Sequence, residues 1–179
     1  METWVNSQHP YRGRIVSLRV GDVRLDDGSL AFREVVEHPG GVAIVPVLGD
    51  SVVLIRQYRI AVGRTVVEIP AGKLEGDEDI EHRAGCEVEE ETGFRAGRLV
   101  PVHPIYASVG YTSEKIHMFL AFDLEKTAQR LDDDERIEPI TVPIADLEPR
   151  LADGAFEDAK TFVGLHALLA YLKRGDNTG

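Results

Sequence analysis

The sequence predicts a mixed α/β fold, a sandwich of helices and mixed sheets with an antiparallel β subdomain at its N-terminus. Three observations support this prediction. Several short runs rich in Val and Ile precede a single central helical stretch. Further strand-like runs follow, and an amphipathic stretch comes last. Helices do not alternate regularly with strands, which argues against a doubly wound parallel sheet.

The first forty residues have the pattern of antiparallel strands. The stretch 14–25 alternates apolar and polar residues, the turn sequence DDGS follows at 26–29, and the stretch 30–36 returns as a partner. A second break, HPGG at 38–41, separates this part from the rest. We therefore expect an N-terminal β subdomain at 1–40 and a second domain at 41–179.

Three strands and the central helix come next. The stretches 42–47, 51–58 and 64–69 are rich in Val and Ile, and Pro70 ends the third. The first of them is almost wholly apolar, as a strand buried on both faces should be. The helix is expected at 79–92, with Gly93 as its C-cap.

The remaining elements complete the sandwich. The stretch 99–106 contains two prolines and predicts an edge or bulged strand, whereas 115–124 predicts a regular strand. A polar loop at 126–136, a strand at 137–142 and a short helix at 143–151 follow. The last helix, 158–172, is amphipathic, and its expected core residues are Phe162, Leu165, Leu168, Leu169 and Leu172.

Composition excludes several classes of function. A formal net charge of −11 argues against a general nucleic-acid-binding protein, which needs Lys and Arg to neutralise phosphates. The single cysteine, Cys86, rules out an intrachain disulfide and is typical of a reducing compartment. We find no signal-peptide pattern and no apolar run long enough to span a bilayer. We therefore expect a cytoplasmic protein that does not associate with a membrane.

The central helix carries glutamates on the side expected to face the protein. Glu87 and Glu91 lie about 40° apart around a helix, on the same stripe as Ile80 and Ala84, and Glu90 is their neighbour. Inward-facing carboxylates repel one another unless cations hold them, and clustered oxygen ligands suit Mg²⁺ or Mn²⁺. The alternative is a solvated acidic helix, which the shared apolar stripe disfavours.

The same stretch resembles the signature of the Nudix hydrolase family, G-x5-E-x7-R-E-U-x-E-E-x-G-U, in which U is a bulky apolar residue. Residues 72–94 match eight of its nine defined positions at the family spacing. The matching residues are Gly72, Glu78, Glu87, Val88, Glu90, Glu91, Gly93 and Phe94. The departure is Cys86, which stands where the family has arginine.

The flanking segments resemble the ADP-ribose pyrophosphatases and related nucleotide-sugar hydrolases of that family. These segments are RQYR at 56–59, EIPAG at 68–72, ASVGYTSEKIH at 107–117, DDERIE at 133–138 and DAKT at 158–161. Val109 departs from them, since ADP-ribose enzymes commonly carry proline there. The resemblance implies a Nudix-type α/β/α sandwich and a homodimer whose N-terminal strands cross to the partner.

The resemblance also implies a reaction, the Mg²⁺-dependent hydrolysis of the pyrophosphate bond of a nucleoside diphosphate sugar. ADP-ribose, yielding AMP and ribose 5-phosphate, is the first substrate to consider. Glu87, Glu91 and Glu90 are the expected metal ligands, together with the Ala71 carbonyl. In this subfamily the general base comes from the late acidic loop, where Asp133 and Glu135 both remain open, and Glu135 is also expected to bind metal. Mn²⁺ is a possible substitute for Mg²⁺.

Further residues are candidates for binding the substrate. Arg56, Arg59 and Arg64 lie just before the signature and could bind phosphates through forked hydrogen bonds, or form surface ion pairs instead. Glu114 is expected to position substrate or metal. Trp4 could stack on a purine, or simply pack.

Two alternatives to an ADP-ribose hydrolase remain. One is a hydrolase that prefers GDP-mannose, ADP-glucose or another nucleotide sugar. The other is a catalytically silent Nudix module that senses a nucleotide. Such modules generally lose the signature glutamates, which survive here.

Arg83 precedes Glu87 by four residues, and we hypothesise that it takes over part of the role of the arginine missing at Cys86.

Overall fold

The structure, a computed structural model, describes residues 1–176 and divides into two compact units. The smaller unit consists of residues 1–40 together with residues 106–115, and the larger unit holds the remainder. The chain thus passes from one unit to the other between Gly40 and Gly41, inside the HPGG break.

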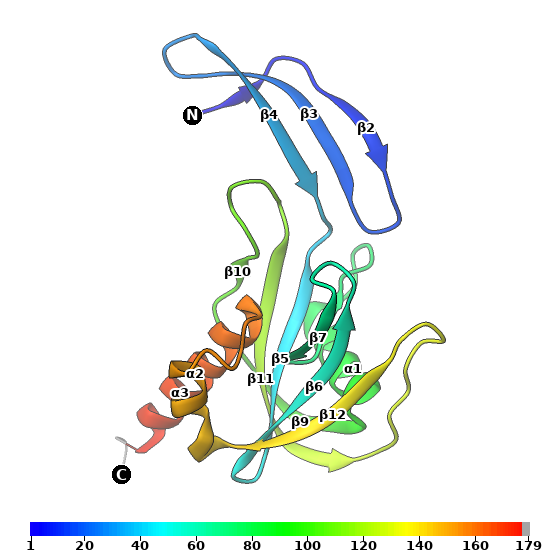
Figure 1. Cartoon of the computed structure of the whole chain (residues 1–179), viewed down its shortest axis with the longest axis vertical. Coiled ribbons are helices and arrows are strands. Elements are labelled where there is room, and N and C mark those ends of the chain that lie inside the picture. The colour runs from blue at the N-terminus through cyan, green and yellow to red at the C-terminus, as the bar shows by residue number, and fades with distance from the viewer. Residues whose placement is uncertain (177–179) are drawn as a thin grey trace. The chain divides into compact units, whose positions relative to one another are not determined.

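The smaller unit is built on an antiparallel sheet of four strands, β1 (Thr3–Trp4), β2 (Gln8–Arg12), β3 (Ser17–Arg24) and β4 (Leu30–Glu37). Strand β3 pairs with β4 along its whole length and with both β1 and β2 on its other edge (Figure 1). The β3–β4 hairpin agrees with the prediction, whereas β1 and β2 were not predicted as separate strands. Residues 106–115 join this unit through backbone hydrogen bonds such as Val36 N to Tyr111 O, 2.8 Å.

The larger unit contains mixed sheets around one central strand, which confirms the predicted fold class. Strand β5 runs parallel to β11 and antiparallel to β6 and β8, while β12 and β7 flank β6 and β9 pairs with β11. The strands are β5 (Gly41–Leu48), β6 (Ser51–Arg59), β7 (Arg64–Glu68), β8 (Ala71–Lys73), β9 (Phe94–Pro101), β10 (Ile105–Tyr106), β11 (Lys115–Lys126) and β12 (Ile137–Pro143).

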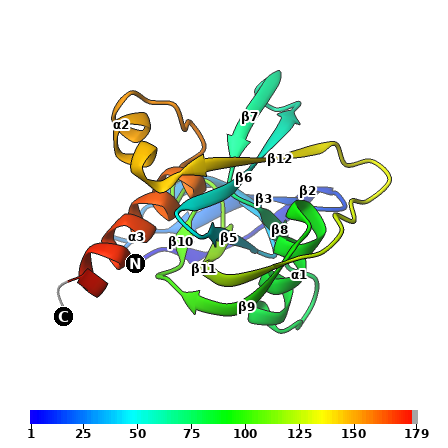
Figure 2. The same cartoon turned by 90° about the horizontal axis from the view of Figure 1, so that it is seen from below.

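Helices cover the two faces of β5. Its residues Ala43, Val45 and Val47 belong to a core cluster shared with α2 (Leu147–Ala152) and α3 (Ala159–Asp176). The alternate residues Val42 and Ile44 pack against α1 (Ile80–Thr92). Figure 2 shows α1 and α3 on opposite sides of β5 and β11. Strand β5 is therefore buried on both faces, as the apolar run at 42–47 predicted.

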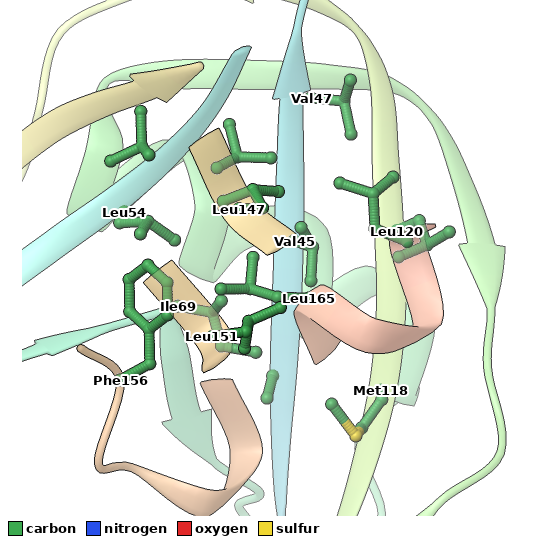
Figure 3. Close-up of a cluster of buried hydrophobic side chains, with 14 of the residues drawn as sticks. Val45, Val47, Leu54, Ile69, Met118, Leu120, Leu147, Leu151, Phe156 and Leu165 are labelled. Atoms are coloured by element: carbon green, nitrogen blue, oxygen red, sulfur yellow. The ribbon is translucent and has the colours of Figure 1, made fainter. Parts of the chain in front are cut away.

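The core on the α3 side is close-packed. Figure 3 shows Leu54 of β6, Met118 of β11, Leu165 of α3 and Phe156 of the loop between α2 and α3 in one cluster with Val45 of β5. Helix α3 approaches β5 closely because it presents Gly164 there: a Cβ at this glycine would lie 2.9 Å from Val45 and 3.2 Å from Met118. Any larger residue would push the helix away.

Several element predictions needed correction. Phe162 was expected in the core, but it is 42% exposed and packs edge-on against His166 instead. Strand β9 begins at Phe94 rather than at residue 99, and β10 is separate from it. The short helix near 143–151 is a 3₁₀ turn, η1 (Ile144–Asp146), followed by α2. Within residues 1–176, no helix is long and apolar enough to cross a membrane.

Candidate active site

Helix α1 is fixed at both ends. The Asp79 side chain accepts a hydrogen bond from the backbone N–H of His82 at 2.7 Å, which caps the first turn. At the other end Gly93 has a φ of 69°, the left-handed conformation that glycine adopts readily, and its N–H donates to Glu89 O. These caps define the two ends of the helix, whose inner face packs Ala84 and Val88 against β5.

Two of the signature glutamates lie on that inner face. Glu87 is 5% exposed and Glu91 is 3% exposed, so the alternative of a solvated acidic helix is wrong for this pair. The backbone N–H of Ala71 donates to Glu91 Oε2 at 3.0 Å. The Glu87 carboxylate lies directly over Gly72, where a Cβ would come within 1.5 Å of Glu87 Oε1. Strand β8 therefore requires glycine at position 72 to accommodate this carboxylate.

Burial and mutual repulsion shift the pKa values of both carboxyl groups upward. Burial raises the pKa of Glu87 to about 7, against the attraction of Arg83 and with additional repulsion from Glu90 and Glu135. Burial also raises the pKa of Glu91 to about 8, with repulsion from Glu87. The Ala71 N–H and the charge of Arg59 oppose the rise at Glu91. Two buried carboxylates that repel each other form a site that favours cations.

Arg83 is the cation in direct contact with Glu87. It donates a hydrogen bond to Glu87 Oε1, and its Nη1 lies 3.5 Å from Glu90 Oε2. The contact that we hypothesised from the four-residue spacing is therefore present. Cys86 lies on a different side of the helix, with its Sγ 3.9 Å from His82.

A pocket of about 210 Å³ opens beside these groups. Its lining is almost wholly charged and consists of Glu75, Arg83, Glu87, Glu90, Arg130, Asp132 and Glu135. Glu135 thus reaches the glutamates of α1 from the loop between β11 and β12, and its charge contributes to their raised pKa values. Asp133 does not line this pocket, and its carbonyl accepts a hydrogen bond from Arg136.

The donors around this pocket suit a hard divalent cation. Five carboxylates line the pocket, and carboxylates are the ligands that Mg²⁺ and Mn²⁺ take in proteins. Throughout residues 1–176, however, no three acidic, histidine or cysteine side chains are already arranged to hold a metal ion. Arg83 supplies the positive charge to Glu87 and Glu90 in this arrangement.

The three candidate arginines have different surroundings. Arg59 forms a forked pair with the buried Glu68, and Arg64 pairs with Glu157 at 2.8 Å. Both arginines line a second pocket, of about 440 Å³, between β7 and the start of α3. Arg56 is 48% exposed, lies 3.4 Å from Glu138 and lines neither pocket.

Trp4 and Glu114 belong to the smaller unit. The Trp4 ring packs under the Arg19 guanidinium, 4.2 Å from the ring centroid, which is an ordinary cation–π contact. Glu114 lies 3.9 Å from His38 Nδ1. Glu68 and Lys160 lie in the flanking segments EIPAG and DAKT but were not predicted as site residues, although a glutamate at the end of the apolar run 64–69 indicates a buried, paired carboxylate.

Comparisons with known proteins agree on one family. The model of the NUDIX domain matches residues 37–163. The chain is 36% identical to the ADP-ribose pyrophosphatase of Bacillus subtilis (strain 168), over 93% of this chain and 92% of that protein. It is 34% identical to the methanol dehydrogenase activator of Bacillus methanolicus, over the same two shares. A crystal structure of an ADP compounds hydrolase has the same fold, with a TM-score of 0.86 over 97% of this chain and 95% of that one, at 24% identity.

Proposed function

The chain belongs to the NUDIX domain family, and from this premise we propose that it hydrolyses the pyrophosphate bond of a nucleoside diphosphate sugar, with ADP-ribose the first substrate. The products would be AMP and ribose 5-phosphate. The observation that carries the proposal is the buried pair Glu87 and Glu91, held against the turn at Ala71 and Gly72. Such a pair suits a cation-dependent reaction on a polyanionic substrate.

Members of this family generally use divalent metal ions, and we propose Mg²⁺ here, with Mn²⁺ as a substitute. Glu87, Glu91 and Glu90 would hold it, with the Ala71 carbonyl and Glu135 as further ligands. When bound, the ion supplies positive charge to the phosphate oxygens and lowers the pKa of a water molecule.

The protein groups divide the remaining tasks. Arg59 and Arg64 bind the phosphates by hydrogen bonds from their guanidinium groups, and Arg56, which lies outside both pockets, contributes less. Glu135 accepts the proton of the attacking water, whose oxygen forms a new bond to phosphorus while the bridging P–O bond breaks. Asp133 stays the second choice for the base. Glu114 and Trp4 stay proposals for substrate contacts.

The proposal is tested with a panel of ADP-ribose, ADP-glucose and GDP-mannose, with phosphate release measured after coupling to a phosphatase. Hydrolysis that requires Mg²⁺ or Mn²⁺ and that is fastest with ADP-ribose is the expected result. Faster hydrolysis of another nucleotide sugar would shift the assignment to that substrate, which the departure at Val109 allows. No release from any substrate would favour a nucleotide-sensing module.

We further propose a cytoplasmic homodimer that uses the smaller unit for association. The smaller unit exposes several large apolar side chains, namely Tyr11, Ile15, Leu30 and Phe32. An exposed apolar surface of this kind is typical of an interface. Sedimentation equilibrium of the wild-type protein and of a Leu30→Asp/Phe32→Asp variant tests this: the variant should be monomeric.

A further inference from the structure

A second ion-pair network lies beside Arg59 and does not belong to the proposed metal site. At its centre is Glu68, at the end of β7, whose carboxylate is 3% exposed. Lys160, in the first turn of α3 and 92 residues further along the chain, donates to Glu68 Oε2. The Lys160 ammonium also lies 3.0 Å from Asp158 Oδ1 and is only 13% exposed itself.

Glu68 is shared between two cations. Arg59 donates to it through Nε, at 2.6 Å, and through Nη2, at 2.9 Å. This fork leaves Nη1 of Arg59, which has no hydrogen-bond partner within residues 1–176. The pair thus fixes the plane of the guanidinium and directs its remaining donor away from Glu68.

The charges explain why a second cation is useful. A carboxylate with a single arginine partner cancels most of that arginine's charge, which then attracts an anion only weakly. Lys160 supplies a further positive charge to the same carboxylate, and Asp158, 3.0 Å from the ammonium, offsets part of that charge, so the main effect of Lys160 is to hold the Glu68 carboxylate in place. Burial alone would raise the pKa of Glu68, but Arg59 and Lys160 outweigh burial and lower it, so Glu68 stays ionised as a fixed anchor.

The start of α3 holds Lys160 in place. Asp158 accepts hydrogen bonds from the backbone N–H of Thr161, at 2.9 Å, and from its hydroxyl, at 2.6 Å. The Thr161 hydroxyl oxygen in turn accepts from the backbone N–H of Ile69 at 2.8 Å. The first turn of α3 is therefore tied directly to the residue after Glu68.

We propose that Lys160 is a positioning residue for the reaction, which holds Glu68 so that Arg59 presents its free edge to the pyrophosphate of the substrate. The pocket that Arg59, Glu68 and Lys160 line together is the place where that anion would bind. Arg59 also lies close enough to Glu91 for their charges to interact, which connects this pocket with the glutamates of α1. The inference rests on the proposed function.

The test compares Lys160→Met and Lys160→Arg with the wild type, on whichever substrate of the panel the wild type hydrolyses fastest. Lys160→Met should raise KM about tenfold or more while kcat stays within about threefold, because ground-state binding of the anion is lost. Lys160→Arg should stay within about threefold of the wild-type KM. Lys173→Met, which removes an exposed lysine from the same helix, is the matched control and should change neither constant.

A double-mutant cycle separates positioning from a merely structural role. If Lys160 acts through Arg59, then Lys160→Met will not raise KM further in an Arg59→Met background. An equal rise of KM in both backgrounds, or a wild-type KM in the single variant, would overturn the proposal. Lys160→Gln, which keeps a polar tip, repeats the cycle if Lys160→Met does not fold. A wild-type protein without turnover on any substrate would contradict the proposed function instead.

Discussion

Arg83 donates a hydrogen bond to Glu87 one turn further along α1, in a helix that carries cysteine at residue 86. The other terminal nitrogen of Arg83, Nη1, forms an ion pair with Glu90. A single arginine thus orients two of the signature glutamates from a position that the signature leaves unspecified.

Replacing Arg83 by alanine should lower kcat at least about tenfold, because Glu87 and Glu90 lose their orienting partner. Steady-state kinetics at saturating Mg²⁺ measure this. Introducing arginine by Cys86→Arg in the Arg83→Ala background should recover part of the lost activity. Arg98→Ala is the matched control, since Arg98 pairs with Asp123 and neither residue lines the pocket. Turnover of Arg83→Ala within twofold of the wild type would contradict the assigned role.

Gly72→Ala should abolish most of the activity, because the new methyl group would occupy the space of the Glu87 carboxylate. Circular dichroism and kinetics distinguish a displaced carboxylate from global unfolding. Gly85→Ala on α1 serves as the control, since its Cβ would meet only Leu99 at 3.9 Å. Alanine is favoured over glycine in a helix by roughly 1 kcal/mol, so this control should be neutral or slightly stabilising.

Glu135→Gln should lower kcat by roughly 10²-fold to 10⁴-fold, the usual contribution of a general base. Asp133→Asn should lower kcat less than about threefold, because Asp133 does not line the pocket that contains Glu87 and Glu90. The pH profile of kcat gives an independent readout for both variants. Loss of the general base should remove the acidic limb of that profile, where kcat rises as the base loses its proton. The reverse order of the two effects would assign the base to Asp133.

The stability of the metal-free protein should fall as the pH rises from about 5 to about 8. The pKa values of Glu87 and Glu91 are raised, to about 7 and about 8, above an ordinary value of 4.5. In that pH window the folded state therefore binds more protons than the unfolded state, and the free energy of unfolding decreases with pH. Thermal denaturation should show a drop in Tm of at least about 3 °C, roughly what 1 kcal/mol produces in a chain of this size.

Glu91→Gln provides the comparison for that measurement. Its Tm should depend less on pH than that of the wild type, because the group with the larger rise in pKa no longer titrates. Adding Mg²⁺ should raise the wild-type Tm more at pH 8 than at pH 6, since the ion binds the deprotonated carboxylates. A wild-type Tm that rises between pH 5 and pH 8 in the absence of metal would contradict the burial of these two groups.

The regular elements were predictable because local pattern and tertiary burial agree there. The apolar run of β5 and the capped helix α1 were both found in the sequence to within a residue or two. Strands β2 and β8 were not, since β2 contains Pro10 among polar residues and β8 has only three residues. Their pairing is decided by neighbours distant in the chain. Phe162 illustrates the opposite error, an apolar residue whose position on α3 leaves it at the surface.

The sequence predicted the candidate site only where the spacing of residues along a helix determines which side chains lie together. The helix period placed Glu87 and Glu91 together, and the structure buries both. The choice between Asp133 and Glu135 could not be made from sequence, because the loop conformation decides which carboxylate turns inward. The network of Glu68 with Lys160 depends on a contact across 92 residues, and no local pattern specifies it.

The bond from Ile69 to Thr161 has a consequence for how the protein matures. Every strand of the sandwich precedes α3 in the chain, so a ribosome releases the sheets before it releases the helix that anchors them. A nascent chain that has just completed β12 already carries the signature glutamates, while the support for Arg59 is still in the exit tunnel. Tight binding of the substrate should therefore arise late in synthesis, when the first turn of α3 docks.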